Sequence, residues 1–288
     1  MDASTKTSIG SSPTGRGLIY LMLGLIAFIA LLPPFYMFAI SLGGTDPAAS
    51  PLEGGLSATA GRTVETYRHV ITDENTDVPL YLRNTLWIAL LSVLGTTISS
   101  AVVAYGFSRV RWRGRGVAFI VMLSTMMIPF PVVMVPLFTM FRDAGWIGTF
   151  APLWVPAWFG NAFSIFLLRQ FFLTLPRELD DASRIDGCGH VRNFIHVILP
   201  LSLPALLVVA LFHFMFVWND FLGPLVFLTH RDQFTLALGL QLYLSKLGQT
   251  PWNLLMAATT IMVAPVLLLF VLMQRTFVEG ISTAGTKG

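Results

Sequence analysis

Residues 84–108 have the sequence NTLWIALLSVLGTTISSAVVAYGFS, in which no side chain is charged. A helix needs about 20 predominantly apolar residues to cross the roughly 30 Å hydrocarbon core of a bilayer. The stretch is long enough, and charged residues flank it directly at Arg83 and Arg109. We therefore predict that residues 84–108 form a membrane-spanning helix.

The composition of the whole chain agrees with a membrane protein. Of the 288 residues, 55% are apolar and 11% are charged, and the mean hydropathy is +0.71, whereas soluble domains carry about 25% charged residues. With 18 basic and 15 acidic residues beside 23 Phe and 24 Gly, the chain is neither disordered nor a basic nucleic-acid-binding domain. Cys188 is the only cysteine, which excludes an internal disulfide and a Cys-rich metal or redox motif.

Six charge-poor apolar runs divide the chain. They are Gly17 to Thr45, Asn84 to Ser108, Gly116 to Phe141, Ala144 to Leu168, Asn193 to Asn219 continuing past Asp220, and Leu247 to Gln274. We predict an all-α polytopic fold with six transmembrane helices at about 18–42, 84–108, 117–141, 149–170, 203–228 and 252–274. Residues 17–275 would form this transmembrane domain, between an N-terminal tail at 1–16 and a C-terminal tail at 276–288. The first run is too long for a cleaved signal and lacks a small-x-small exit, so it is interpreted as a span.

The Lys and Arg residues indicate the orientation of the spans, because cytoplasmic loops carry more of them than outside loops do. Twelve of the 18 basic residues lie in the N-terminal tail, the loop 109–116, the segment 169–196 and the C-terminal tail. The loop 43–83 has three Arg against six acidic residues. We therefore expect this loop outside the membrane and both termini in the cytoplasm.

The segment 234–244 is too short to span a bilayer. Leucine occupies every second position of it from Leu236 to Leu244. This alternation favours a strand or an irregular interfacial element over a helix.

The most regularly patterned loop lies between the fourth and fifth predicted spans. Pro176 suits the first turn of a helix, and Gly187 supplies the left-handed residue that ends one. The sequence therefore predicts a short helix over 176–186. Two ion pairs are expected on it at i,i+4 spacing, Arg177 with Asp181 and Asp180 with Arg184.

A second amphipathic turn follows, with apolar residues at helical spacing before Pro200 and Pro204. Two short helices, a Gly turn and a proline make a compact elbow, residues 176–200, that protrudes from the membrane. Such an elbow can enter a cleft in a cytoplasmic partner. It can also be a solvated loop with surface ion pairs that each contribute less than about 1 kcal/mol. The spacing alone leaves both interpretations open.

The elbow resembles the EAA signature of ABC-importer permeases. The matching residues are Glu178-Leu-Asp-Asp-Ala182-Ser-Arg-Ile-Asp186-Gly187, then Phe194, Ile198-Leu199-Pro200 and Pro204. The usual Glu-Ala-Ala is Asp181-Ala182-Ser183 here, and the usual Ala after Asp-Gly is Cys188. Asp181 keeps the charge with a reach shorter by one methylene.

Further stretches resemble the carbohydrate-uptake branch of that family, and most of all the six-span permease of maltose and multiple-sugar systems. They are Tyr67 to Ile71 with Arg83-Asn84-Thr85, Met127 to Leu137, Gly145-Trp146, Leu167 to Phe172, Trp218 to Phe221 and the tail from Gln274 to Gly288. The resemblance covers about residues 60–288. It implies a type I importer fold in a prokaryotic inner membrane, with both termini cytoplasmic.

The resemblance also implies the partners and the role of the elbow. The partners would be a second homologous permease, two nucleotide-binding ATPase subunits, an extracytoplasmic substrate-binding protein and membrane lipid, with no nucleic acid. The elbow would be the coupling helix that seats in a groove of the ATPase. Matched positions that would couple to the ATPase are Glu178, Asp181, Ala182, Asp186, Gly187, Phe194 and Pro200.

The chain has no G-x-x-x-x-G-K-[ST] phosphate loop. It is therefore expected to be a non-catalytic subunit without a cofactor or metal of its own. ATP and Mg would bind to the partner ATPase subunits.

Asp220 is an acidic residue with an apolar span on both sides, next to Trp218 and Asn219. An ionisable residue within a membrane segment is a functional-site hypothesis. Asp220 could hydrogen-bond sugar hydroxyls while Trp218 stacks on a sugar face, or it could lie at the outer interface or pair structurally. His213 and the small residues Gly95 and Ser99 are interpreted as packing residues.

Two other classes of protein compete with the importer hypothesis. An ion-coupled secondary transporter for a small polar solute would show inverted repeats and several buried carboxylates, and the sequence has no convincing repeat. An intramembrane enzyme would need a nucleophile with a base, or a metal cluster. The sequence contains no H-E-x-x-H, no paired intramembrane Asp and no G-x-S-x-G.

Overall fold

The computed structural model describes residues 13–43, 55–73, 76–244 and 250–285. Every regular element in these ranges is a helix, and none is a strand, which confirms the all-α prediction. The chain forms two compact units, Met1–Thr72 with Tyr243–Ile261 and Asp73–Leu242 with Met262–Gly288. The candidate site lies entirely within the second unit.

The first unit contains α1 (Pro13–Ser41), α2 (Gly55–Thr72) and the start of α14 (Trp252–Gly285). Apolar side chains of α1 such as Leu21 and Phe28 are exposed, as suits a helix in contact with lipid. The Ser41 hydroxyl lies 3.1 Å from the Tyr67 hydroxyl of α2. The sequence predicts only a loop where α2 forms.

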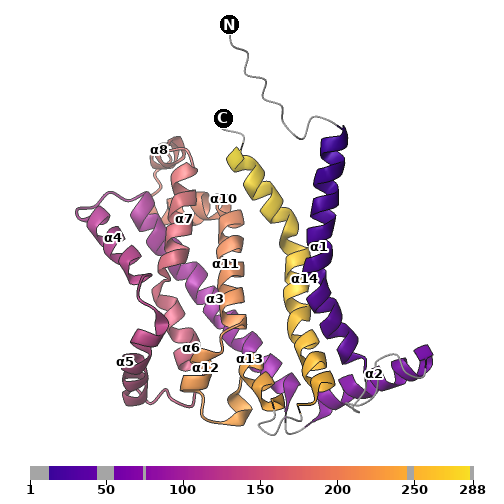
Figure 1. Cartoon of the computed structure of the whole chain (residues 1–288). Helices are drawn as coiled ribbons and strands as arrows, with labels where there is room; N and C mark the ends of the chain where they lie inside the picture. The colour runs from indigo at the N-terminus through magenta and orange to yellow at the C-terminus, as the bar shows by residue number, and fades with distance from the viewer. Residues whose placement is uncertain (1–12, 44–54, 74–75, 245–249, 286–288) are drawn as a thin grey trace. The chain divides into compact units, whose positions relative to one another are not determined.

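The longest helix of the second unit is α3 (Val78–Ser108), which begins at an Asp77 side chain that accepts from the Leu80 amide at 3.0 Å. It packs against α7 (Ala162–Thr174) and α11 (Leu203–Trp218) (Figure 1). A Cβ added at Gly95 would lie 2.5 Å from the Trp158 ring. Gly95 is therefore a packing residue, as predicted, because only a hydrogen in place of a side chain admits that ring.

The third predicted span is bent in the structure, and the fourth consists of several short helical elements. In place of 117–141, α4 (Arg115–Thr125) and α5 (Phe130–Asp143) meet at 95°. Pro129 lies at the break, and its ring blocks continuation of the helix. The fourth span comprises α6 (Ala151–Trp154), the 3-10 helix η1 (Val155–Phe159) and α7.

In place of 203–228, α11 ends at Trp218, and α12 (Leu222–Phe227) follows after a turn. The Asp220 carboxylate accepts from the Gly223 amide at 3.1 Å within this turn, so the polar residues stabilise a break where hydropathy alone suggests continuity. The segment His190–Leu201 before α11 meets it at 78°. By length and composition, four helical segments in the described part of the chain could cross a membrane, or up to six if each bent pair is one span.

The predicted strand or irregular element at 234–244 is wrong, because the segment forms α13 (Leu236–Gly239) and η4 (Leu240–Tyr243) after η3 (Arg231–Gln233). Side chains of α3 take the place of a partner strand. Asn84 donates to the carbonyls of Asp232 and Phe234 at 2.8 and 3.1 Å, and the Leu236 amide donates to the Thr85 hydroxyl at 2.8 Å. At the end of the chain, α14 stays helical to Gly285, within the predicted tail 276–288.

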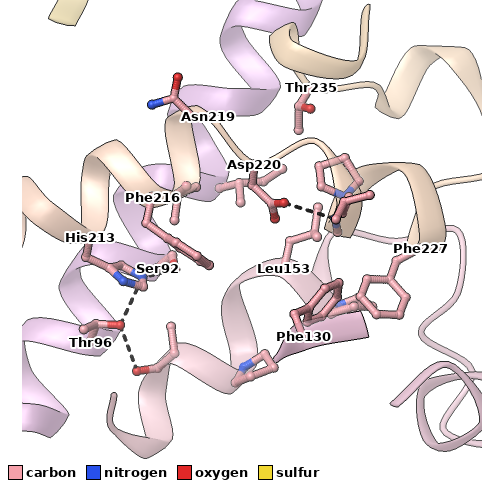
Figure 2. A pocket seen from close by; sticks show the side chains of 18 of the residues that line it. Ser92, Thr96, Phe130, Leu153, His213, Phe216, Asn219, Asp220, Phe227 and Thr235 are labelled. Carbon is pink, nitrogen blue, oxygen red and sulfur yellow. Dashed lines mark hydrogen bonds between the residues drawn. The ribbon is translucent and has the colours of Figure 1, made fainter. Parts of the chain in front are cut away.

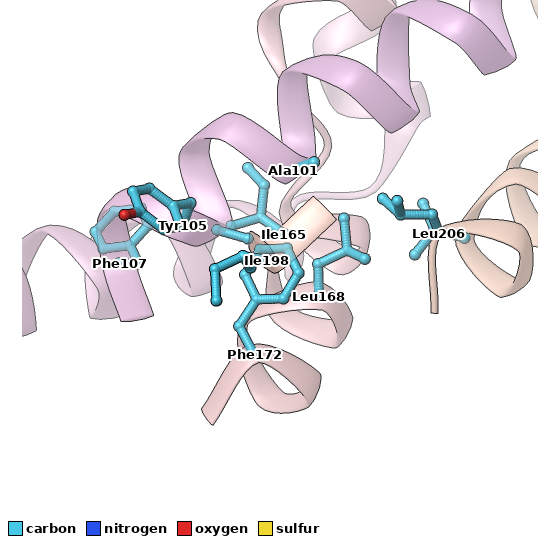
Figure 3. Packing of buried hydrophobic residues seen from close by; sticks show 10 residues of the cluster. Ala101, Tyr105, Phe107, Ile165, Leu168, Phe172, Ile198 and Leu206 are labelled. Carbon is cyan, nitrogen blue, oxygen red and sulfur yellow. The ribbon is translucent and has the colours of Figure 1, made fainter. Parts of the chain in front are cut away.

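A buried apolar cluster joins α3 and α7 to the segment that leads into α11 (Figure 3). Its largest fully buried members are Phe172, Leu168 and Ile198. Tyr105 and Phe107 belong to it from the last turns of α3. The cluster includes Ile198, with Phe194 packed against it, so it joins the second part of the elbow to α3 and α7.

Candidate functional site

The elbow consists of short helices joined by a glycine turn. They are α8 (Glu178–Ile185), α9 (His190–Asn193), the π-helix η2 (Phe194–Ile198) and α10 (Leu199–Leu201). Gly187 has a φ of +77°, so it is the left-handed residue that the sequence predicts at the end of the first helix. A Cβ added at Gly187 would meet nothing within 4 Å, and this side of the turn therefore faces open space.

The first helix of the elbow has two different faces. Asp180 and Ser183 are buried, at 5% and 6% exposure. Asp181, Ala182, Asp186 and Gly187 are exposed, as is Glu178. Five of the seven residues predicted to couple to a partner therefore share one accessible surface, which we call the outer face of the elbow.

Phe194 and Pro200 differ from those five residues. Phe194 is half-buried and its ring centroid lies 5.0 Å from that of Tyr105 on α3. Its contact is with the apolar cluster, so it supports the elbow from inside. Pro200 is exposed and lies in α10, directly before the 78° bend into α11.

A buried ion pair ties the elbow to the end of α3. The Arg109 Nη1 atom lies 2.7 Å from Asp180 Oδ2, and the two side chains are 2% and 7% exposed. Asn193 donates to the other carboxylate oxygen at 2.8 Å and to the Tyr105 hydroxyl at 3.2 Å. Arg109 also donates to three backbone carbonyls near the end of α7, those of Phe172, Leu175 and Pro176.

This network corrects the predicted ion pairs. Asp180 pairs with Arg109 and not with Arg184, and Arg184 pairs with Asp181 at 3.2 Å on the exposed side. Arg177 donates to the Ser108 carbonyl at 3.2 Å. The i,i+4 rule considers neighbours on one helix only, whereas the folded chain brings Arg109 from 71 positions upstream.

A cavity of about 690 Å³ opens beside the middle of α3 (Figure 2). Thr85, Ile88, Ser92 and Thr96 line it from α3, at the spacing of one helix face. Its other walls come from α6, η1, α11, α12 and the start of α5. Its size lies within the range of about 300–1,000 Å³ that is usual for small-molecule sites.

Polar groups are spread over the wall of this cavity. The His213 Nε2 atom lies 2.7 Å from the Ser92 hydroxyl and 3.1 Å from that of Thr96, which confirms His213 as a hydrogen-bonded residue of the helix bundle. Asn219 and Asp220 also line the cavity. Asn219 is exposed, and its side-chain amide donates to the Met215 carbonyl at 2.7 Å.

Trp218 has a different environment from its two neighbours. It is 1% exposed, stacks on Phe214 with centroids 5.1 Å apart, and donates from its indole to the Met262 carbonyl at 3.1 Å. Both faces of the ring are therefore occupied by protein. The sequence hypothesis that Trp218 stacks on a sugar is corrected accordingly, whereas Asn219 and Asp220 keep access to the cavity.

The structure adds residues that the sequence does not single out. Arg109 is one of four arginines in the loop 109–116, and no local pattern distinguishes it from the others. Ile185, at 88% exposure, and Val191, at 72%, are apolar side chains on the surface of the elbow. Among the described residues, no group of three or more His, Cys, Asp or Glu is arranged to hold a metal ion.

Comparison with known proteins matches most of this chain to one family. The model of the family described as "Binding-protein-dependent transport system inner membrane component" matches residues 95–283. The trehalose/maltose transport system permease protein MalG of Thermococcus litoralis is 34% identical over 276 residues, which is 94% of this chain and 97% of MalG. The arabinooligosaccharides transport system permease protein AraQ of Halalkalibacterium halodurans is 31% identical, over 96% of this chain and 99% of AraQ.

A solved structure has the same fold. It is the crystal structure of a bacterial ABC transporter involved in the import of the acidic polysaccharide alginate. The TM-score is 0.76 at 23% identity, over 92% of this chain and 98% of the matched chain. The overall fold of this chain is therefore one that a chain of a known transporter also adopts.

Proposed function

Because the chain belongs to the family of binding-protein-dependent transport system inner membrane components, it is a permease subunit of an ABC importer, and we propose that this importer takes up a carbohydrate. The chain would form half of the translocation pathway. It would receive mechanical work through the outer face of the elbow. The names of the relatives, which transport trehalose, maltose or arabinooligosaccharides, support a carbohydrate as substrate.

The proposal includes the rest of the transporter. A second homologous permease would complete the pathway, and an extracytoplasmic binding protein would deliver the substrate. Two ATPase subunits would bind ATP and Mg and hydrolyse ATP, since this chain contains no phosphate loop. Both termini and the elbow would lie on the cytoplasmic side of a prokaryotic inner membrane, as the distribution of basic residues supports.

The two-faced elbow is the observation that carries the proposal. Its inner face is fixed to α3 by buried hydrogen bonds, while on its outer face Asp181, Ala182 and Gly187 are exposed within the part of the chain that the structure describes. A loop that merely connects two spans has no need for a buried ion pair. An element that must bear force needs firm attachment on one side and an accessible contact surface on the other.

The cavity beside α3 supports a polar substrate. The amide of Asn219 and the carboxylate of Asp220 on its wall can exchange hydrogen bonds with the hydroxyls of a sugar. Asn219 and Asp220 are the residues that we assign to the substrate pathway. Trp218 is left out of this assignment because its ring is buried.

The proposal is tested by Gly187→Asp. The new side chain adds bulk and charge at a position with open space around it, so a clash can arise only with a partner. We expect normal membrane insertion, with loss of the copurifying ATPase or of substrate-stimulated ATP hydrolysis. Insertion is measured by membrane abundance, and the ATPase by pull-down through a tag on this subunit.

Gly114→Asp is the matched control. Gly114 is also exposed, has a φ of +85° and lies in the basic loop on the same side of the predicted topology, so the strain of a left-handed aspartate is the same. This control should keep the ATPase. If Gly187→Asp also retains full substrate-stimulated hydrolysis, the elbow does not dock against the ATPase and the proposal fails.

A further inference from the structure

The Arg109–Asp180 ion pair lies where the elbow, α3 and α7 meet, and its geometry differs from that of other ion pairs in the described residues. Arg142–Asp143 and Arg184–Asp181 are exposed pairs within single segments. Arg109–Asp180 is buried and joins residues 71 positions apart. A buried, charge-assisted contact keeps its geometry better than an exposed pair, because water does not compete for its hydrogen bonds.

Each carboxylate oxygen of Asp180 connects the elbow to α3. Oδ2 accepts from Arg109, the residue that directly follows α3. Oδ1 accepts from Asn193, which also donates to the Tyr105 hydroxyl one turn earlier on α3. Asp180 therefore connects both helices of the elbow, α8 and α9, to the same end of α3.

The other end of this connection reaches the cavity. Helix α3 has no break between Val78 and Ser108, whereas the segments on either side of it in the cavity wall are bent or interrupted. Thr96 is the cavity-lining residue of α3 that is closest in sequence to Arg109, and the two lie about 20 Å apart along the helix axis at 1.5 Å per residue. An unbroken helix held at one end transmits a tilt of that end to the whole cavity-lining face.

We propose that Arg109 and Asp180 are positioning residues that transmit movement of the elbow to α3, and that α3 then changes access to the cavity. The inference rests on the proposed function for the source of the movement. Without this link, the outer face of the elbow could still bind the ATPase and ATP could still be hydrolysed. The conformational state of the cavity would then no longer follow the nucleotide.

The experiment uses the assembled transporter in liposomes and a reporter in the cavity. Phe216 lines the cavity and is 69% exposed. A Phe216→Cys, Cys188→Ala version of this subunit, with cysteine-free partners, carries one thiol there. The rate of its reaction with a membrane-impermeant maleimide is measured without nucleotide and after trapping with MgADP and vanadate, together with ATP hydrolysis.

Asp180→Ala is the variant that removes the buried ion pair. It eliminates the contacts to Arg109 and Asn193, while Arg109 keeps its three carbonyl acceptors. The Phe216→Cys, Cys188→Ala subunit without further changes is the reference protein. In it, we expect the labelling rate to differ by about fivefold or more between the nucleotide-free and the vanadate-trapped transporter. In Asp180→Ala the two rates should differ by less than about twofold. ATP hydrolysis should persist in the variant and lose its dependence on the binding protein.

Two further variants separate transmission from folding. Asp180→Asn keeps the shape of the side chain. The Asn193 Oδ1 atom accepts no hydrogen bond from the described residues. A flip of that amide therefore gives the new side-chain amide an acceptor, and we expect a partial return of the nucleotide response. Asp143→Asn makes the same change in an exposed pair and should leave the response unaltered.

The outcomes distinguish this proposal from the proposed function. If the reference protein recovers no ATPase or shows no nucleotide-dependent labelling, the importer mechanism fails, and the link fails with it. If the reference responds and Asp180→Ala responds equally, the link alone is overturned.

If Asp180→Ala does not assemble, Arg109→Lys replaces it, because lysine keeps the charge but cannot reach the carboxylate and the carbonyls together. An unchanged response in Arg109→Lys would also overturn the link.

Discussion

The two halves of α3 lie in contrasting surroundings. Toward the elbow, Ala101, Ala104 and Tyr105 are buried in an apolar cluster, and Arg109 is enclosed by hydrogen-bond acceptors. Toward the cavity, Ser92 and Thr96 make side-chain hydrogen bonds to one histidine, beside a space of about 690 Å³. One helix thus passes from a buried apolar cluster with an ion pair to a cavity wall on which buried hydroxyls bond a histidine.

The difference indicates which end of α3 is held by the stronger contacts. A closely packed region has few alternative arrangements and transmits a displacement without absorbing it. The hydroxyl–imidazole hydrogen bonds at the cavity join neutral groups, and such bonds contribute less than hydrogen bonds to charged groups do. We therefore expect substitutions at the elbow end to lower the unfolding free energy of the subunit most, and substitutions at the cavity wall to lower it least.

The largest effect is expected for Arg109→Ala. It leaves the buried Asp180 carboxylate without its counter-charge and three backbone carbonyls without their donor. Breaking a buried ion pair in this way costs about 3–5 kcal/mol. The measurement is the unfolding free energy of the purified subunit in mixed micelles of increasing denaturing detergent.

Arg142→Ala is the comparison for that variant. Its ion pair with Asp143 is exposed, and such pairs contribute about 0–1 kcal/mol. Equal losses in the two arginine variants would mean that the elbow end of α3 is no more tightly held than the surface.

Smaller changes in stability, of opposite sign at two positions, are expected from glycine-to-alanine substitutions on α3. Gly95→Ala places a methyl group against the Trp158 ring, and such overpacking costs about 1–3 kcal/mol. Gly106→Ala meets nothing within 4 Å and should stabilise the helix by about 0.5–1 kcal/mol. Thermal unfolding midpoints of the two variants should therefore move in opposite directions from the wild type; a shift in the same direction would contradict the packing described for Gly95.

The smallest effect is expected for Ser92→Ala at the cavity wall. The change removes one of two hydroxyl partners of His213 and leaves Thr96 in place. Side-chain hydrogen bonds between membrane helices average about 0.6 kcal/mol, so the unfolding free energy should fall by about that amount. A loss as large as that of Arg109→Ala would show that the cavity wall is as rigid as the elbow end.

The sequence predicts the broad organisation well, because that organisation follows from local composition. Charge-free runs locate the apolar helices, and the proline and glycine positions locate the elbow and its left-handed turn at Gly187. The outer-face residues, including Asp181 and Gly187, follow from a motif whose spacing is fixed within one short segment.

What the sequence does not predict depends on contacts between distant segments. The partner of Asp180 directly follows another helix, and the Trp218 indole donates to the carbonyl of Met262, which is 44 positions away. The leucines at 236–244 alternate with a period of two, which is typical of a strand. In the structure, however, Asn84 and Thr85 form hydrogen bonds with backbone groups of this region, so no partner strand is needed. Polar side chains on one helix thus decided the structure of a segment far along the chain.

The length of α3 has a consequence for the membrane itself. Its 31 residues extend for about 46 Å at 1.5 Å per residue, which exceeds the roughly 30 Å of hydrocarbon in a typical bilayer. Such a helix must lean or project into the headgroups, and how far it leans depends on the acyl-chain length of the surrounding lipids. Thicker bilayers favour an upright α3 and thinner ones an inclined α3, so lipid composition acts on the same helix that the elbow moves.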